Sequence, residues 1–255
     1  MAASTLVKDV LYRVSVQLHD LSPQFNRWTS RELVSWLNDG QRAIAKYVPT
    51  SCSRVDSIKL AAGTKQSIDY VLSANIKPGD GSAATNVKGN ALQSVLRNMG
   101  PDGQTPGKAV RIADRETMDA NDPYWHQSTG SEVSVYVYDP RNPKVFYVSP
   151  GVKSSANLWA EISWLTDPAE IDVAGSYAWD GNSTTKISID DKFADDLTNY
   201  VLARAYLKDA EAAANAASAA AAASMFTSSI NAQAAAITGV NPNLRALPFA
   251  PTAKA

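Results

Sequence analysis

A glycine-rich segment is the closest approach of this sequence to a catalytic motif. Residues 103–108 read GQTPGK. A phosphate-binding loop follows the pattern G-x-x-x-x-G-K-[ST], in which backbone N–H groups surround the phosphates. Here one spacer residue is missing, and Ala109 stands where Ser or Thr would bind magnesium. We therefore interpret the segment as a flexible turn.

Histidine, cysteine and acidic residues could bind a metal or transfer protons, but their number and spacing favour neither role. The histidines are His19 and His126, and Cys52 is the only cysteine. These are too few for a zinc site of the usual Cys/His type, which has four ligands. Aspartate pairs stand at 190–191 and 195–196, where the dipole of a following helix favours acidic residues. The sequence predicts no catalytic residue, no metal ligand and no cofactor, and hence no enzyme.

The composition describes a chain that can fold without covalent cross-links. It has 255 residues, of which 45% are hydrophobic and 19% charged, and this argues against wholesale disorder. Lysine and arginine number 24 against 25 aspartates and glutamates, so no basic excess indicates binding to nucleic acid. The first residues resemble no signal peptide, and no stretch is typical of a membrane span. We expect a soluble intracellular protein.

Helices are predicted at both ends of the chain. Apolar residues spaced by three and four predict a first helix over 7–21, capped by Ser4 or Thr5. Thr29 and Glu32 have capping-box spacing and begin a second helix, which ends at Pro49. The two form an antiparallel helical hairpin. A further helical pattern begins at Asp190.

The middle of the chain is typical of an antiparallel β module with long loops. Apolar alternation and turn residues suggest its elements in order. They are a hairpin over 54–72, a loop over 77–90, a strand or short helix over 91–99, a loop over 100–107, a strand near 109–113, a short helix over 114–122, a hairpin with strands at 133–138 and 145–148, and a strand over 158–165.

The last helical pattern is unusual in composition. Alanine fills 11 of the 14 positions 210–223, and no charged residue lies between Glu211 and Arg245. Unbroken to residue 239, this helix would be about 70 Å long, whereas a compact chain of this size is about 45 Å across. It must therefore bend, break or project, and 227–229 (TSS) is a possible break. Small uncharged residues favour close packing, partly against other subunits, although alanine also suits an isolated helical rod.

These elements predict an α+β fold. Residues 1–51 and 189–239 form a helical bundle with an N-terminal hairpin and a long C-terminal helix. Residues 52–188 form an inserted antiparallel β domain. Residues 240–255 form an extended tail, which is either a disordered terminus or a peptide that docks on a partner.

Three segments carry a resemblance to a known family: DPYW at 122–125, YDPRNPKVFYVSP at 138–150 and YVLARAYLKDAE at 200–211. In this order the chain resembles, over about residues 5–238, the head-to-tail adaptor proteins of tailed bacteriophages, the dodecameric connectors below the portal. The alanine tract is longer and purer than expected for that family.

The resemblance implies a structural virion protein of the phage neck, assembled in the host cytoplasm. It implies a homo-oligomeric ring, a dodecamer as in that family, between the portal protein and the tail tube or nozzle protein. Genomic DNA would pass through the ring without sequence-specific binding, and no membrane would be involved.

The resemblance also implies three groups of contact residues. The tail residues expected to dock on the portal are Leu244, Arg245, Leu247, Pro248 and Phe249. The residues expected to pack between subunits are Tyr200, Arg204, Leu207, Ala213, Ala217, Ala220, Met225 and Phe226. The loop residues expected to face the tail are Lys77, Asp80, Lys88, Asp102 and Lys108.

Three other functions stay open at this point. The chain could be another ring-forming neck protein, such as a stopper or tail-completion protein. It could be a carbohydrate-binding β module on a helical stalk, which exposed Trp and Tyr in one pocket would favour. It could be a hydrolase with aspartates brought together by the fold, which a buried carboxylate pair with raised pKa would favour.

Overall fold

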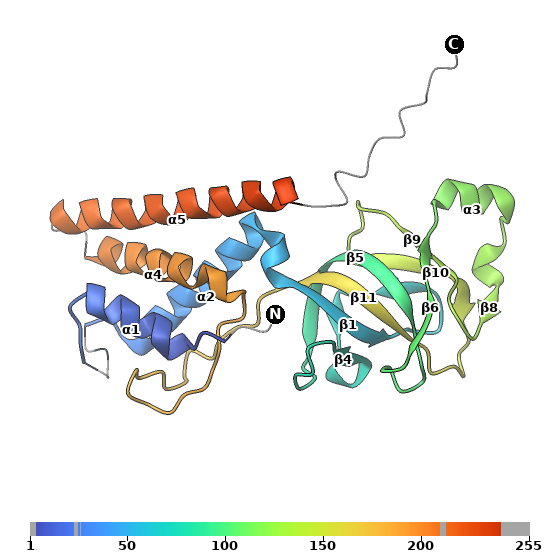
Figure 1. Cartoon of the computed structure of the whole chain (residues 1–255), viewed down its shortest axis with the longest axis horizontal. Coiled ribbons are helices and arrows are strands. Elements are labelled where there is room, and N and C mark those ends of the chain that lie inside the picture. Colours follow the sequence, from blue (N-terminus) through green and yellow to red (C-terminus); the bar gives the residue numbers. More distant parts are fainter. Residues whose placement is uncertain (1–3, 23–24, 26, 210–212, 241–255) are drawn as a thin grey trace, which may run out of the picture. The chain divides into compact units, whose positions relative to one another are not determined.

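The computed structural model describes residues 4–22, 25, 27–209 and 213–240. The chain is mixed α and β, and the described residues divide into two compact units (Figure 1). One unit contains residues 49–169 and holds the sheets. The other contains the described parts of 3–48 and 170–255 and holds the long helices. The expected boundary at residue 188 therefore differs from the structure, in which 170–188 groups with the helices.

A buried amide explains why residues 170–188 group with the helical unit. The Nδ2 of Asn38 donates to the carbonyl of Ile171 at 2.8 Å, and the backbone N–H of Ile171 donates to Oδ1 of Asn38 at 3.0 Å. Further along, the N–H of Ser188 donates to Oε1 of Gln41 at 2.6 Å. Both polar side chains are buried on the helix that carries them, so the segment completes their hydrogen bonding.

The helical unit is built from four helices. They are α1 (Val7–Gln17), α2 (Ser30–Tyr47), α4 (Ala194–Lys208) and α5 (Ala213–Val240). In Figure 1, α4 lies between α1 and α5, and it contacts α1, α2 and α5. Their buried faces are apolar and include Val10, Leu37 and Leu197, with Phe193 just before α4.

The two N-terminal helices form, but the predicted antiparallel hairpin needs correction: α1 ends at Gln17 rather than at residue 21, and α1 and α2 each pack mainly against α4. The capping box of α2 is present: the N–H of Glu32 donates to Oγ1 of Thr29 at 3.4 Å, and the N–H of Thr29 donates to Glu32 at 3.3 Å. Helix α1, however, begins after Leu6 without a side-chain cap. The N–H groups of Ser4 and Thr5 instead donate to the Asp191 carboxylate at 2.8–2.9 Å.

The long C-terminal helical pattern breaks into two helices that pack against each other. Helix α4 ends at Lys208 and α5 begins at Ala213, so the break lies near Asp209 rather than at 227–229. The 28 residues of α5 span about 42 Å. The Phe226 ring meets the Tyr200 ring edge-on at 5.2 Å. Because the chain forms two helices that pack against each other, neither reaches the length of about 70 Å calculated for an unbroken helix.

The β-rich unit contains two sheets. The first has the strand order β3-β5-β11-β1-β4, with β6 paired to β5, and the second has the order β2-β10-β9-β7, with β8 paired to β10. Their strands are β1 (Ser53–Lys59), β2 (Gly63–Ser67), β3 (Tyr70–Val71), β4 (Ile76–Pro78), β5 (Val87–Met99), β6 (Pro106–Ala109), β7 (Arg111–Ile112), β8 (Thr129–Gly130), β9 (Val135–Tyr138), β10 (Val145–Val152) and β11 (Trp159–Thr166).

Both sheets contribute to one apolar core. Trp164, Ile162, Phe146 and Val148 are fully buried in it. Most strand pairs are antiparallel, but β7–β9 and β8–β10 are parallel. A short helix, α3 (Arg115–Asn121), follows β7 and is capped by Asp114, whose carboxylate accepts from the N–H of Thr117 at 3.0 Å. The expected helix over 114–122 is thereby confirmed.

The predicted hairpin over 54–72 is wrong. Strand β1 pairs with β11 and β4, whereas β2 pairs with β10 in the other sheet. Gly63 adopts a φ of 94°, and Gln66 exchanges two hydrogen bonds with the backbone of Ala61, at 2.7 and 2.8 Å. This bend carries the chain from one sheet to the other. The hairpin of β9 and β10 is confirmed, with Phe146 opposite Tyr138.

Candidate interaction surfaces

An apolar groove between α4 and α5 collects much of the predicted inter-subunit surface. It encloses about 370 Å³. Helix α4 lines one side and helix α5 the other. The lining residues are Tyr200, Ala203, Arg204, Leu207, Ala216, Ala219, Ala220, Ala223, Phe226 and Thr227. Five of the eight residues predicted to pack between subunits lie here; Ala213, Ala217 and Met225 lie outside the groove.

The inner and outer faces of α5 differ sharply in exposure. Ala219, Ala222, Phe226 and Ile230 are buried in the helical unit. Phe226 therefore packs within its own chain, against Tyr200, rather than offering a free side chain to a neighbour. Met225 is 59% exposed, as is Leu207 on α4. The predicted surface thus divides into side chains that hold α4 and α5 together and side chains that are open to solvent.

The hydroxyl groups of α5 add little polarity to its surface. Ser218 donates to the carbonyl of Ala214 at 3.0 Å, and Thr227 donates to the carbonyl of Ala223 at 2.9 Å. Such bonds to the preceding turn occupy the hydroxyl proton within the helix. Together with the absence of charged residues between Glu211 and Arg245, they give α5 a weakly hydrated outer face.

Arg204 is the charged side chain of this groove. Its guanidinium lies 5.4 Å from the Tyr200 ring centre and donates to the Tyr200 hydroxyl at 3.1 Å. That hydrogen bond raises the pKa of Arg204. Arg204 is exposed and forms no salt bridge with the residues that the structure describes. The groove therefore combines an apolar floor with one oriented, always positive group.

The loop residues predicted to face the tail are only partly in loops. Lys77 lies in β4, Lys88 in β5 and Lys108 in β6, whereas Asp80 and Asp102 lie in turns. The segments 77–90 and 100–107 were expected to be loops throughout. Backbone pairing to β1, β3 and β5 extends strands into both. The expectation underestimated how far flanking strands continue into Gly- and Pro-rich sequence.

The GQTPGK segment forms a closed turn. The Asp102 carboxylate accepts hydrogen bonds from the N–H of Gln104 at 3.0 Å and the N–H of Thr105 at 3.1 Å. These two bonds, with one from the Thr105 hydroxyl, lower the pKa of Asp102 to about 2. Gly103 has a φ of 68° and packs against Trp159. Two of the N–H groups that a phosphate would need are thus already bonded.

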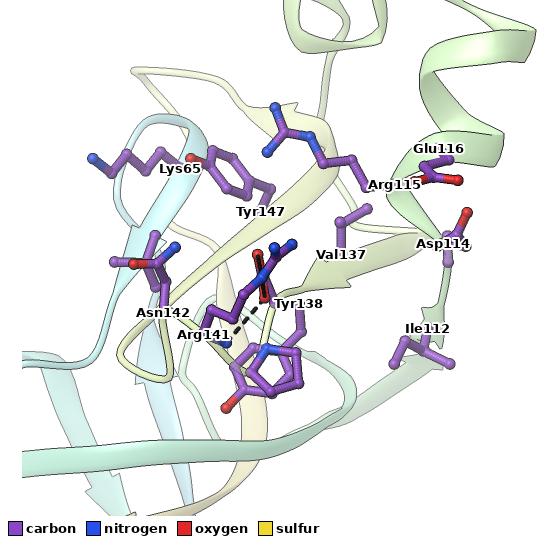
Figure 2. A pocket seen from close by; sticks show the side chains of 14 residues that line it. Lys65, Ile112, Asp114, Arg115, Glu116, Val137, Tyr138, Arg141, Asn142 and Tyr147 are labelled. Carbon is purple, nitrogen blue, oxygen red and sulfur yellow. Dashed lines mark hydrogen bonds and ion pairs between the residues drawn. The ribbon is translucent and has the colours of Figure 1, made fainter.

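A second pocket, in the β-rich unit, was not predicted from the sequence (Figure 2). It encloses about 660 Å³. Strand pairing places Tyr147 of β10 between Lys65 of β2 and Val137 of β9. Arg141 extends from the β9–β10 turn and binds the Asp139 carboxylate at 3.1 Å. The YDPRNPKVFYV segment was the available signal, because it supplies the turn and much of strand β10 that line this pocket.

Charges of both signs line this pocket, and several already have structural partners. Asp114 caps α3, and Asp139 is hydrogen-bonded to Arg141, which lowers the pKa of Asp139. Arg115 lies over the Tyr147 ring at 5.9 Å. The arrangement suits a mixed polar and aromatic contact surface rather than selective binding of one charge.

Comparison with protein families was made over the whole chain. A family model described as SU10 adaptor protein matches residues 1–245. The chain belongs to this family. No match was found among curated proteins. Membership identifies the chain as a structural adaptor-type protein of bacteriophages, in agreement with the resemblance noted in its sequence.

The residues that could have served catalysis in this adaptor take part in local packing and hydrogen bonding. His126 stacks on Trp125 with ring centres 3.6 Å apart, and Cys52 is buried. Asp191 binds the N-terminal segment, and hydrogen bonds from Ser4 and Thr5 hold the pKa of Asp191 well below its usual range. Asp196 accepts from Gln233 at 2.8 Å. Within the described ranges, no three His, Cys, Asp or Glu residues gather as a possible metal site.

The C-terminal tail of the adaptor carries the residues predicted to dock on the portal. The predicted portal-docking residues Leu244, Arg245, Leu247, Pro248 and Phe249 lie outside the described residues. The family match nonetheless extends to residue 245.

Among the described helices, none combines the length and apolar character needed to cross a membrane.

Proposed function

We propose that this chain is a head-to-tail adaptor that forms a homo-oligomeric ring in the virion neck. The ring, a dodecamer by the resemblance, would join the portal protein to the tail tube or nozzle protein and continue the DNA channel. Membership of the SU10 adaptor family carries the proposal. The role is structural and involves no enzymatic step, cofactor or membrane, and assembly takes place in the host cytoplasm.

The surface of the helical unit supports self-association. A helix that faces water normally carries charged side chains on its exposed face. The 28 residues of α5 contain none. Met225 on α5 and Leu207 on α4 are both more than half exposed. Covering these side chains in a ring would remove apolar surface from water at about 25 cal/mol per Å².

The charge balance supports a conduit rather than a DNA-binding protein. Lysine and arginine number 24 and aspartate and glutamate 25, giving a net charge of −1. A strongly basic channel would bind phosphates and release counterions, which would retard the genome. A near-neutral ring would bind the DNA backbone only weakly, so passing DNA would have few such contacts to break.

Separate parts of the chain would contact the two partners. The tail over 241–255 contains three apolar side chains, Leu244, Leu247 and Phe249, in a proline-rich setting suited to docking in extended form. The β-rich unit would face the tail, with Asp80 and Asp102 in its turns and Lys77, Lys88 and Lys108 near strand ends.

The test is the mass of the purified chain by light scattering, alone and mixed with portal rings of the same virus. We expect a ring-on-ring complex, with or without prior self-assembly. A chain that stays monomeric and binds no portal would refute the proposal. Binding to tail tubes but not to portal rings would replace it with a stopper or tail-completion role. The tryptophans do not favour a carbohydrate-binding role, because all six are buried or half-buried.

A further inference from the structure

Helix α1 carries an apolar stripe on its outer face. Tyr12 is 44% exposed and Val16 41% exposed, and the two are one helical turn apart. Asp9 is exposed on the same side. The inner face of α1 is occupied by Val7, Val10, Leu11 and Val14, which are fully buried. Both side chains of the outer stripe therefore remain partly open to solvent.

The stripe is held in a defined orientation. The Tyr12 ring contacts Trp179, with ring centres 5.4 Å apart. On the neighbouring turn, Arg13 binds Asp195 of α4 at 2.7 Å. A rotation of α1 that buried Val16 would break that ion pair and expose Val10 or Val14. The stripe thus presents two apolar side chains and one acidic side chain as a fixed surface.

The α4–α5 groove has complementary features. Half of its ten lining residues are alanine, which leaves room for larger side chains such as Tyr and Val. Leu207 at its edge is 59% exposed, and its charged group is Arg204, which has no salt bridge to any described residue. An apolar stripe with an acidic neighbour therefore fits a groove with a basic edge, both in size and in charge.

We propose that the α1 stripe of one copy packs into the α4–α5 groove of the next copy. The proposal rests on the ring formation argued above and names the two surfaces that form it: Tyr12 and Val16 lie against the alanine floor and Leu207, and Asp9 faces Arg204. The stripe and the groove share no residue and lie on different helices, with α4 between α1 and α5 (Figure 1).

A contact between two different surfaces is heterologous, so each copy keeps one free stripe and one free groove. Contacts of this kind repeat head to tail and close into a ring when the rotation per copy divides a full turn. An isologous contact, in which a surface meets its own copy, would stop at a dimer. The proposal therefore predicts the pattern of assembly as well as its location.

Charge insertion tests the two surfaces. Val16→Asp and Leu207→Asp, both at exposed positions of the full chain, should fold normally and raise the concentration needed for ring formation roughly tenfold or more. The matched controls are Val55→Asp and Leu72→Asp in the β-rich unit, where the side chains are 43% and 50% exposed. The controls should leave assembly unchanged. Normal assembly of both Val16→Asp and Leu207→Asp would overturn the proposal.

Disulfide cross-linking tests the pairing itself. In the assembled state, the double variant Val16→Cys/Leu207→Cys should oxidise to a ladder of covalent oligomers. A mixture of the two single variants should give dimers only, and each single variant alone should give none. Cys52 is buried, and the wild-type chain measures any background from it. Efficient cross-linking of either single variant alone would show an isologous contact and overturn the proposal.

The outcomes separate this proposal from the function on which it rests. If the wild-type chain assembles with portal rings but the cysteine pair gives no ladder, the adaptor function stands and this interface is wrong. If the wild-type chain forms no ring under either condition, both are wrong. A charge reversal adds an independent check: Arg204→Glu should weaken assembly, and Asp9→Arg in the same chain should restore it.

Discussion

Replacing Asn38 by alanine should destabilise the helical unit by about 2–4 kcal/mol. The side chain is 2% exposed and exchanges two hydrogen bonds with the backbone of Ile171, at 2.8 and 3.0 Å. Each bond contributes about 1 kcal/mol net. The two bonds together give the lower figure. The upper figure applies when the N–H and C=O of Ile171, itself buried, are left without partners, at about 2 kcal/mol for each of the two groups.

The assay is urea unfolding followed by circular dichroism at 222 nm, which reports mainly the helical unit. The control is Asn182→Ala, an exposed asparagine in the same connecting segment, whose replacement should change stability by less than about 0.5 kcal/mol. We also expect faster proteolysis of the segment after Ile171 in Asn38→Ala. If Asn38→Ala loses no more stability than Asn182→Ala, Asn38 does not anchor the 170–188 segment.

The remaining predictions concern other parts of the chain. Gly103→Ala should cost about 1–3 kcal/mol in urea unfolding, because φ is +68° and a Cβ would lie 2.8 Å from Trp159; an unchanged midpoint would contradict this account of the turn. Asp191 has a lowered pKa in the folded chain, so its stabilisation is complete above the unfolded-state pKa near 3.8 and is lost progressively as pH falls from there toward the lower folded pKa; Asp191→Asn should flatten that acid dependence in unfolding measured from about pH 5 to pH 2. Ala220→Glu should impair assembly, measured by light scattering, while leaving the monomer's unfolding unchanged. Deleting 241–255 should leave the circular dichroism spectrum intact and abolish co-sedimentation with portal rings.

Local sequence signals predicted most elements that depend on near neighbours. The capping box at Thr29 and Glu32, the short helix over 114–122 and the alternation over 133–148 each describe interactions within a few residues, and the structure contains all three. Such signals are reliable because their energy comes from hydrogen bonds and packing that the segment makes with itself.

Long-range partners were the part that sequence reasoning missed. Ser4 and Thr5 have the residue types of a helix cap, but the Asp191 carboxylate competes for their N–H groups and α1 begins later. The turn at 62–64 was typical of a hairpin, yet its two strands join different sheets. Nothing within either segment encodes a partner that lies far away along the chain.

The candidate surfaces were only partly predicted, because they too depend on contacts between segments that are far apart in the sequence. The α5 side of the groove lies in the charge-free stretch that is visible in the sequence, whereas its α4 residues were expected from the family resemblance. The division between Phe226, which is buried in its own unit, and Met225, which is exposed, required knowledge of the break near Asp209. The β-unit pocket depends on cross-strand register, which sets Tyr147 beside Lys65, and register is not fixed by strand propensity alone.

The break in the alanine-rich region connects the composition of the chain to its proposed assembly. An unbroken helix of about 70 Å would expose its second half, which has no charged residue after Glu211, to water. Folding back at Asp209 covers one face of α5 with α4, and Phe226 and Gln233 hold the two together. The outer face of α5 carries alanine and neutral polar side chains but no charge, so it is less strongly hydrated than a charged helix face. Alanine on that face fits the proposed packing against another copy, because its small side chain lets two helices approach closely and loses little conformational entropy when buried.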